Sequence, residues 1–98
     1  MANWYTDEVR TLFSAILTLK DQDECRAFFE DVCTVKELRE IAQRLQVAQL
    51  LREGSSYAAI NAQTGVSTAT ISRVSRCLEY GSGGYELALN RLEKERDA

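Results

Sequence analysis

The 98-residue sequence contains no proline and no histidine. Without proline, no helix interior is forced to kink or break, and good helix formers such as Ala, Leu, Glu, Arg and Gln are abundant. Without histidine, the chain lacks the most common general base and the most common metal ligand of proteins. The sequence therefore predicts an all-α protein and gives no support to an enzyme.

Cysteine patterns and long apolar runs are also missing. The three cysteines, Cys25, Cys33 and Cys77, are odd in number and have no Cys-x-x-Cys spacing. A structural zinc site normally needs four ligands, so we expect reduced thiols and no metal site. No secretory h-region and no run of 18 apolar residues occurs, and the start, MANWYTDEVR, is mixed and polar. We therefore expect a soluble, cytoplasmic protein with no membrane partner.

The size of the chain suits one small domain. Its hydrophobic fraction of 45% is ordinary for a globular protein. We find no internal repeat and no second domain, so residues 1–98 are predicted to form a single helical domain. A chain this small has a large surface for its volume, and a partner would be needed to cover several long apolar stripes. This favours an oligomer.

Six helices are predicted from apolar residues that recur at spacings of three and four. A capping-box pattern, Thr34 with Glu37, marks the start of the third helix, and Gly54 marks its end. The charged final residues, KERDA, are expected to fray. The approximate bounds of the six helices are 6–20, 21–33, 34–53, 57–64, 67–80 and 85–95.

The first, second, third and sixth helices carry apolar stripes. The stripe of the third keeps an alternating three-and-four spacing, which either core packing or a dimer seam would explain. The sequence leaves both interpretations open. The stripe of the third helix is Leu38, Ile41, Leu45, Ala48 and Leu51, and that of the sixth is Tyr85, Ala88, Leu89 and Leu92.

Residues 56–80 have the layout of a helix-turn-helix. Gly65 can adopt the left-handed conformation of a tight turn, and Val66 follows it as a turn hydrophobe. An ordinary αα-hairpin has the same pattern, so this layout alone does not establish DNA binding. Apolar residues on both sides of the turn would hold the two helices together: Ile60, Ile71 and Val74.

Charge distinguishes this segment from the rest of the chain. Residues 54–78 contain two arginines and no Asp or Glu, whereas residues 1–31 contain three basic and seven acidic side chains. A surface that approaches phosphates must be free of like charge. The acid-free segment therefore favours DNA binding over a plain hairpin.

The outer face of the fifth helix supports the same interpretation. At 100° per residue, its small and hydroxyl-bearing side chains lie opposite an apolar side made by Ile71, Val74 and Leu78. Such a face can enter the major groove, hydrogen-bond base edges or phosphates, and contact a thymine methyl group. The predicted DNA-binding residues are Ser56, Tyr57, Ser67, Thr68, Ala69, Ser72, Arg73 and Arg76.

A third stripe of this helix, Thr70, Arg73 and Cys77, lies between the apolar side and the outer face. Arg73 makes the stripe too polar for a core, and the stripe is turned away from the centre of the outer face. We expect this flank to border a cleft against the third helix.

The segment TVKELREIAQRLQVAQLLREGSSYAAINAQTGVSTATISRVSRCLE resembles the Trp repressor superfamily, specifically its small members of the YerC/YecD type. REIAQRLQVAQLL and TGVSTATISR are the most specific parts, and the six-helix layout extends the resemblance to nearly the whole chain. It implies a six-helix Trp-repressor-like fold, an intertwined homodimer, and two helix-turn-helix heads on double-stranded DNA. Two-fold symmetry would then require a palindromic operator with half-sites about one helical turn apart.

The resemblance also implies a cleft between the third and fifth helices for a small-molecule co-repressor. In the family, the ring of an amino-acid ligand lies between two arginines. The positions of this chain that match these arginines are Arg44 and Arg73. Without a ligand, both would pair with nearby acids such as Glu37 or Glu40, or with phosphate. The predicted ligand-cleft residues are Thr34, Arg44, Thr70, Arg73 and Cys77.

Four positions depart from the Trp repressor pattern. Val74 replaces a glycine that makes room for the indole ring, and Asp31 replaces an apolar pocket residue. A valine would close a pocket fitted to an aromatic ring, so we expect a ligand other than tryptophan. Ala58 and Asn61 replace basic residues, which leaves phosphate contacts to arginines, hydroxyls and helix N-termini.

The sequence thus predicts a sequence-specific DNA-binding transcriptional regulator, a repressor, that acts as a homodimer and needs no cofactor beyond a possible co-repressor. A helical protein–protein interaction module is the alternative, favoured by the acidic N-terminal half and the few basic residues. We do not expect an enzyme, because the serines and threonines of the fifth helix have no base beside them.

Overall fold

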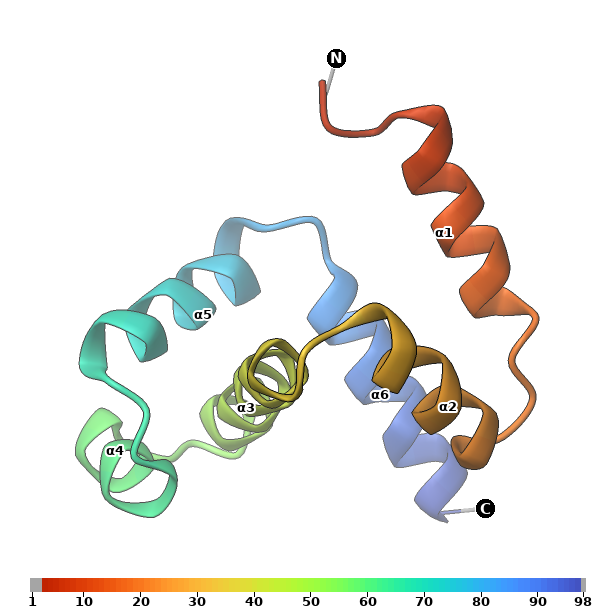
Figure 1. The fold of residues 1–98 in the computed structure, drawn as a ribbon. Coiled ribbons are helices and arrows are strands. Elements are labelled where there is room, and N and C mark those ends of the chain that lie inside the picture. Colours follow the sequence, from red (N-terminus) through yellow and green to blue (C-terminus); the bar gives the residue numbers. More distant parts are fainter. Residues whose placement is uncertain (1–2, 98) are drawn as a thin grey trace. The chain divides into compact units, whose positions relative to one another are not determined.

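The computed structural model describes residues 3–97, and these residues form six helices and no strand (Figure 1). The protein is therefore all-α, as predicted. The chain forms two compact units, Met1–Leu38 and Arg39–Ala98. The prediction of a single domain over residues 1–98 stays a prediction. The helices are α1 (Asp7–Leu17), α2 (Gln22–Val32), α3 (Val35–Arg52), α4 (Tyr57–Thr64), α5 (Thr68–Tyr80) and α6 (Gly84–Asp97).

Side-chain oxygens cap the starts of five helices, because the first backbone N–H groups of a helix have no partner within it. These caps fix the start of each helix at or next to the predicted residue. The acceptors and donors are Thr6 with the Val9 N–H, Asp21 with Glu24, Thr34 with Glu37, Ser56 with Ala59, and Ser67 with Thr70.

The start of α3 confirms the predicted capping box. The Glu37 N–H donates to Thr34 Oγ1 at 3.1 Å, and the Thr34 N–H donates to Glu37 Oε1 at 2.9 Å. The bond from the Thr34 backbone favours the ionised carboxylate, so it holds the pKa of Glu37 below its usual value. The cap therefore stabilises α3 while Glu37 is ionised, and this stabilisation is lost as the pH falls through the lowered pKa.

Two helix ends differ from the predicted bounds. α1 stops at Leu17, and the Thr18 hydroxyl donates to the Ala15 carbonyl at 2.6 Å, which closes the last turn before Lys20. α6 continues to Asp97, although fraying was expected in KERDA. Lys94 and Arg96 lie in its last turn, where positive charge is favourable at the negative end of the helix dipole.

Four helices of the second unit share one small hydrophobic core. Val47 and Ala48 come from α3 and Leu89 from α6, while α4, the turn and α5 supply the remainder. The predicted packing residues of the helix-turn-helix, Ile60, Val66, Ile71 and Val74, are all buried, with exposed fractions of 0, 8, 0 and 2%. The two helices of the predicted motif are thus held by the contacts that the sequence indicated.

The predicted stripe of α3 is only partly correct. Ala48 is buried, and Leu45 and Leu51 pack against the core, but Ile41 is 51% exposed. Val47, which lies outside the stripe, is fully buried instead. The core-facing side of α3 is therefore rotated toward Val47 in the second half of the helix.

The apolar side chains of the first unit remain largely uncovered within one chain. Neither α1 nor α2 contains a buried residue. Leu17 is 84% exposed, Trp4 61% and Phe13 40%. Phe13 and Leu17 lie on the apolar face of α1, which a single chain leaves largely exposed.

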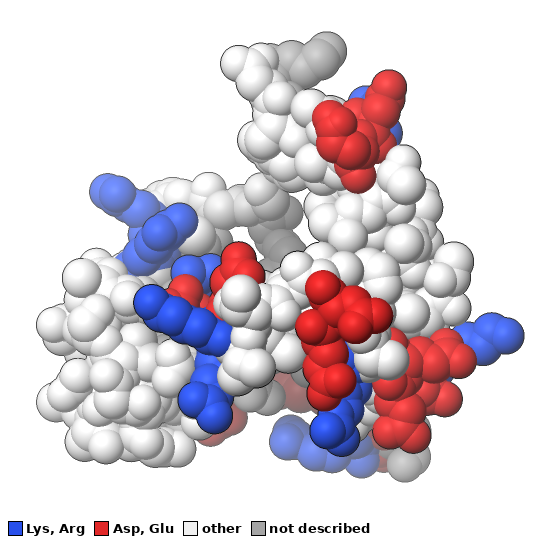
Figure 2. Space-filling model, in the orientation of Figure 1, with Lys and Arg blue, Asp and Glu red and all other residues white. Residues whose placement is uncertain are grey.

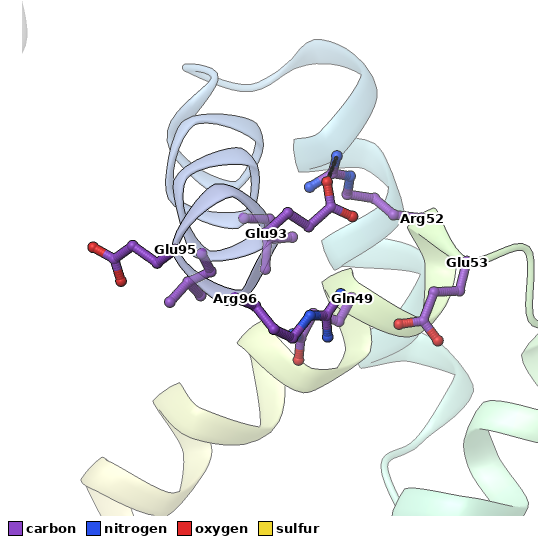
Figure 3. Close-up of a pocket in the computed structure, with 8 residues that line it drawn as sticks. Gln49, Arg52, Glu53, Glu93, Glu95 and Arg96 are labelled. Atoms are coloured by element: carbon purple, nitrogen blue, oxygen red, sulfur yellow. Dashed lines mark ion pairs between the residues drawn. The ribbon is translucent and has the colours of Figure 1, made fainter. Parts of the chain in front are cut away.

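A polar cluster joins the end of α3 to α6. Arg52 Nη2 donates to Asn90 Oδ1 at 2.7 Å, and the guanidinium also lies within 4 Å of two carboxylates, those of Glu86 (3.8 Å) and Glu93 (3.9 Å). Figure 3 shows the side chain of Glu93 on α6 beside that of Arg52. Both residues line a hollow of about 510 Å³. Since α4 follows α3 directly, this cluster ties the helix-turn-helix to α6.

We expect Arg52→Ala to lower the free energy of unfolding by about 1–2 kcal/mol, because it removes one direct hydrogen bond and two weaker ion pairs. Arg26→Ala is the matched control, since Arg26 is 79% exposed and forms only the local pair with Glu30. That change should cost less than about 0.5 kcal/mol. Urea unfolding at one fixed protein concentration measures both, and equal losses would contradict the role of Arg52.

Candidate nucleic-acid interface

The turn between α4 and α5 is closed by its own hydrogen bonds. Gly65 has φ of 74°, in the left-handed region that favours glycine, and its N–H donates to the Asn61 carbonyl at 2.8 Å. The Asn61 amide donates to the Val66 carbonyl at 2.8 Å. The Thr64 hydroxyl donates to the Ile60 carbonyl and accepts from the Val66 N–H. These bonds fix the direction in which α5 leaves the turn.

Asn61 therefore has a structural role in this protein. Its side-chain amide donates to the Val66 carbonyl and is thus used within the turn.

The two sides of α5 differ as the sequence predicted. Ile71 and Val74 are buried, and Leu78 is half-buried against the same core. All eight predicted DNA-binding residues are exposed, and their contact with DNA stays a prediction. In Figure 2 the surface over α4 is free of carboxylates, and basic side chains lie over α5.

Helix dipoles add positive potential at the same place. α4 and α5 have no acidic residue in the first turn, whereas each of the other helices has at least one. An acidic side chain in the first turn offsets the positive end of a helix dipole, and its absence leaves N–H groups free to attract anions. The two helix starts of this segment are therefore suited to phosphate.

Two of the predicted contact residues already have partners in the protein. Ser56 and Ser67 accept from the backbone N–H groups of Ala59 and Thr70, and the Ser67 hydroxyl also donates to Thr70 Oγ1 at 3.2 Å. Their hydroxyls are thus fixed as helix caps. Tyr57 begins α4 and is 40% exposed, so its hydroxyl is free to reach outward.

The structure brings only part of the predicted ligand cleft together. Arg44 and Thr70 line one hollow of about 400 Å³ between α3 and the start of α5. Arg73 and Cys77 do not line it. Thr34 belongs to the first unit, where its hydroxyl serves the capping box of α3. The full lining of the hollow is Glu40, Gln43, Arg44, Gly65, Val66, Ser67 and Thr70.

Tyr85, the second residue of α6, is half-buried. It was assigned to the apolar face of the sixth helix, and it does pack against the core. Burial raises the pKa of its hydroxyl, the charge of Cys77 raises it further, and the guanidinium groups of Arg44 and Arg73 lower it. No local pattern in the sequence indicates that the start of α6 returns to α3 and α5.

The side chain of Val74 fills the space that would be open if residue 74 were a glycine. Its side chain is 2% exposed and belongs to the core.

Within residues 3–97, no group of three or more His, Cys, Asp or Glu residues could hold a metal ion. The helices of that range are also too short or too polar to cross a membrane.

Comparisons with known proteins agree with this geometry. The family model described as Trp repressor protein matches residues 7–93. The uncharacterised protein YerC of Bacillus subtilis (strain 168) is 55% identical over 87 residues, which cover 89% of this chain and 84% of YerC. The crystal structure of a TrpR-like protein from Eubacterium eligens ATCC 27750 has a TM-score of 0.88 at 53% identity and covers 91% of this chain and 92% of its own. That of a candidate Trp repressor from Staphylococcus aureus has a TM-score of 0.86 at 46% identity, with coverages of 90% and 88%.

Proposed function

This chain belongs to the Trp repressor family, and on that premise we propose that it is a sequence-specific DNA-binding regulator, a repressor, that inserts α5 into the major groove. One observation carries the proposal. Residues 54–78 contain no acidic residue, and α5 buries Ile71 and Val74 while it exposes a face of small and hydroxyl-bearing side chains. A repressor of this kind blocks transcription by occupying its operator.

The exposed face divides by chemistry into two parts. Thr68, Ala69 and Ser72 are short enough to let the helix axis approach the bases, and they offer hydroxyl and methyl groups. Arg73 and Arg76 lie further along α5, where their longer side chains reach phosphates. Phosphate contacts position the protein and make its affinity depend on salt, whereas base contacts provide specificity.

We expect Arg76→Ala to weaken binding about tenfold on every duplex, because it removes one phosphate contact per subunit. In a dimer, the slope of log K against log salt concentration should become shallower by about two. Arg91→Ala on α6 removes the same charge from an exposed position outside the helix-turn-helix and should change neither quantity. Fluorescence anisotropy with a duplex found by footprinting on genomic DNA measures both.

The alternative function is a helical interaction module that contacts protein through the same motif. It would be favoured if a folded wild-type dimer bound no duplex at about 50 mM salt, where phosphate contacts are strong. Binding that is unchanged by Arg76→Ala would also count against a DNA-facing α5.

The proposed functional unit is a homodimer in which the apolar side chains of α1 and α2 pack against a second copy. Support comes from the exposure of these two helices. Neither contains a buried residue within one chain, and Phe13 and Leu17 lie on an apolar face of α1 that stays exposed. Two heads related by two-fold symmetry would bind successive major grooves and double the few positive charges of one chain.

We expect the wild-type protein to have twice the chain mass of 11.1 kDa in light scattering after size exclusion. Phe13→Asp places a charge in the apolar face of α1 and should shift the protein toward the monomer. Ser14→Asp adds the same charge to the same helix outside that face and should leave the dimer intact. A wild-type protein that stays at 11.1 kDa at micromolar concentration would contradict the proposal.

Regulation by a small ligand other than tryptophan forms the last part of the proposal. Its support is the hollow that contains Arg44 and Thr70, which lies against the first turn of α5 and suits a carboxylate-bearing molecule. A ligand there would contact α3 and α5 together and could therefore change how α5 is presented.

A thermal-shift screen of amino acids and carboxylate metabolites tests this regulation. A bound ligand should raise Tm of the wild-type protein, because it stabilises the folded state. Arg44→Ala should abolish the shift, whereas Arg91→Ala should keep it. If no compound of these classes shifts Tm, ligand regulation through this hollow is wrong, and the DNA-binding proposal is unaffected.

A further inference from the structure

An aromatic cluster lies at the start of α1, within the first unit. The ring centroids of Trp4 and Tyr5 are 5.3 Å apart with the planes tilted by 60°, and those of Tyr5 and Phe13 are 6.0 Å apart in an edge-to-face contact. Aromatic pairs prefer tilted contacts at centroid distances of about 4.5–7 Å. Three rings from both sides of the helix start therefore pack as one group.

Arg10 fixes this group against the helix. Thr6 caps α1, so Tyr5 comes directly before the cap and Arg10 is the fourth helical residue. A hydrophobic staple usually joins two apolar side chains at these two positions. Here a cation–π contact takes that role: the guanidinium carbon of Arg10 lies 5.1 Å from the centroid of the Tyr5 ring, and Arg10 Nη1 lies 3.2 Å from Asp7 Oδ1.

The backbone holds Trp4 in a defined place beside this contact. The Thr6 N–H donates to the Trp4 carbonyl at 3.0 Å, and the Thr6 side chain accepts from the Val9 N–H. The indole nevertheless stays 61% exposed. A large side chain that is already ordered binds a partner favourably, because little conformational entropy is lost on association.

The first unit has too little core to be stable alone. Neither helix of Met1–Leu38 contains a buried residue, and Cys25 and Cys33 are free thiols. Within residues 3–38, no group of His, Cys, Asp or Glu side chains could hold a metal ion. Units shorter than about 40 residues usually depend on disulfides, metals or association. Association is what remains for this unit.

The exposed surface is large enough for a stable dimer. The chain exposes 7925 Å², whereas a folded monomer of 11.1 kDa typically exposes about 5,700 Å². The excess is about 2,200 Å² per chain, so two chains would together bury about 4,400 Å². Interfaces of obligate homodimers bury areas of this size.

The chemistry of the cluster also suits a second copy of this chain. A two-fold contact brings the same patch of both copies together, so the patch must be complementary to itself. This patch supplies an exposed indole, which is the aromatic group that attracts cations best, and a guanidinium. Trp4 of one copy and Arg10 of the other are therefore groups that attract each other.

We propose that Trp4 is a hot spot of the homodimer interface: the contact between Tyr5 and Arg10 holds the indole ring in place before association, and a second copy covers this ring when the dimer forms. The inference rests on the homodimer of the proposed function and is independent of DNA binding. It adds the turn before α1 to an interface that the proposed function places on α1 and α2.

Fluorescence of the wild-type protein tests this directly, because Trp4 is the only tryptophan of the chain. In the dimer its emission should be blue-shifted, since the indole is removed from water. On dilution the emission should shift to the red. The midpoint of this shift should coincide with the midpoint at which the mass falls from dimer to monomer in sedimentation equilibrium.

Variants separate the hot spot from the residue that positions it. Trp4→Ala should raise Kd of the dimer by at least about 30-fold, because each copy loses a buried tryptophan. Arg10→Ala should raise Kd about fivefold, because Tyr5 loses its fixed position, and Arg10→Lys should restore most of this loss since it keeps the cation. The matched controls are Tyr80→Ala, an aromatic residue of the second unit that is 81% exposed, and Arg26→Ala on α2; both should leave Kd unchanged.

The outcomes distinguish a failure of this inference from a failure of the homodimer. A dimer whose emission stays that of an exposed indole, or whose Kd is unchanged in Trp4→Ala, overturns the inference and leaves the homodimer standing. A wild-type monomer with blue-shifted emission also overturns it, since the same chain would then cover the ring. A wild-type monomer with the emission of an exposed indole contradicts the homodimer itself, and the inference with it. The fluorescence measurement needs no variant, so it decides even if Trp4→Ala does not fold.

Discussion

The second unit depends on the packing of Ile60, Ile71 and Val74 across the turn at Gly65. These three side chains come from two helices of only 8 and 13 residues, which are too short to be stable on their own. Each helix is held because its apolar side is buried against the other and against α3. The exposed side of α5 exists as a defined surface only because the opposite side is anchored in this way, so the core comes before any contact with DNA.

In this acidic protein, the surface that is proposed to contact phosphates differs in charge from the rest of the chain. Its net charge is −3, yet residues 54–78 contain no carboxylate, and the first turns of α4 and α5 contain no acidic residue. Under the proposed function, long-range attraction to DNA would therefore be weak, and affinity would have to come from short-range contacts, repeated by symmetry in the proposed dimer. Such a protein should discriminate strongly between its operator and bulk DNA, because little non-specific attraction competes with base contacts.

Local signals predicted most of the fold, and tertiary contacts account for what they missed. The capping box at Thr34, the left-handed Gly65 and the two sides of α5 depend on residues within a few positions, so the sequence alone predicted them. The burial of Val47 depends on how α3 packs, which no periodicity specifies. The cleft was predicted from the flank of α5 and from resemblance, and the structure divides it. Arg44 and Thr70 border a hollow, whereas Arg73 and Cys77 do not line it.

The hydrogen bonds of the turn have a consequence for how this protein can diverge. Asn61 and Thr64 close the turn with their own side chains, and neither belongs to the face of Thr68, Ala69 and Ser72. The groups that set the geometry of the head and those proposed to read bases are therefore separate sets of residues. Substitutions at Thr68, Ala69 and Ser72 would therefore leave the hydrogen bonds of the turn intact. Under the proposed function, the operator sequence could change while the fold of the helix-turn-helix stays the same.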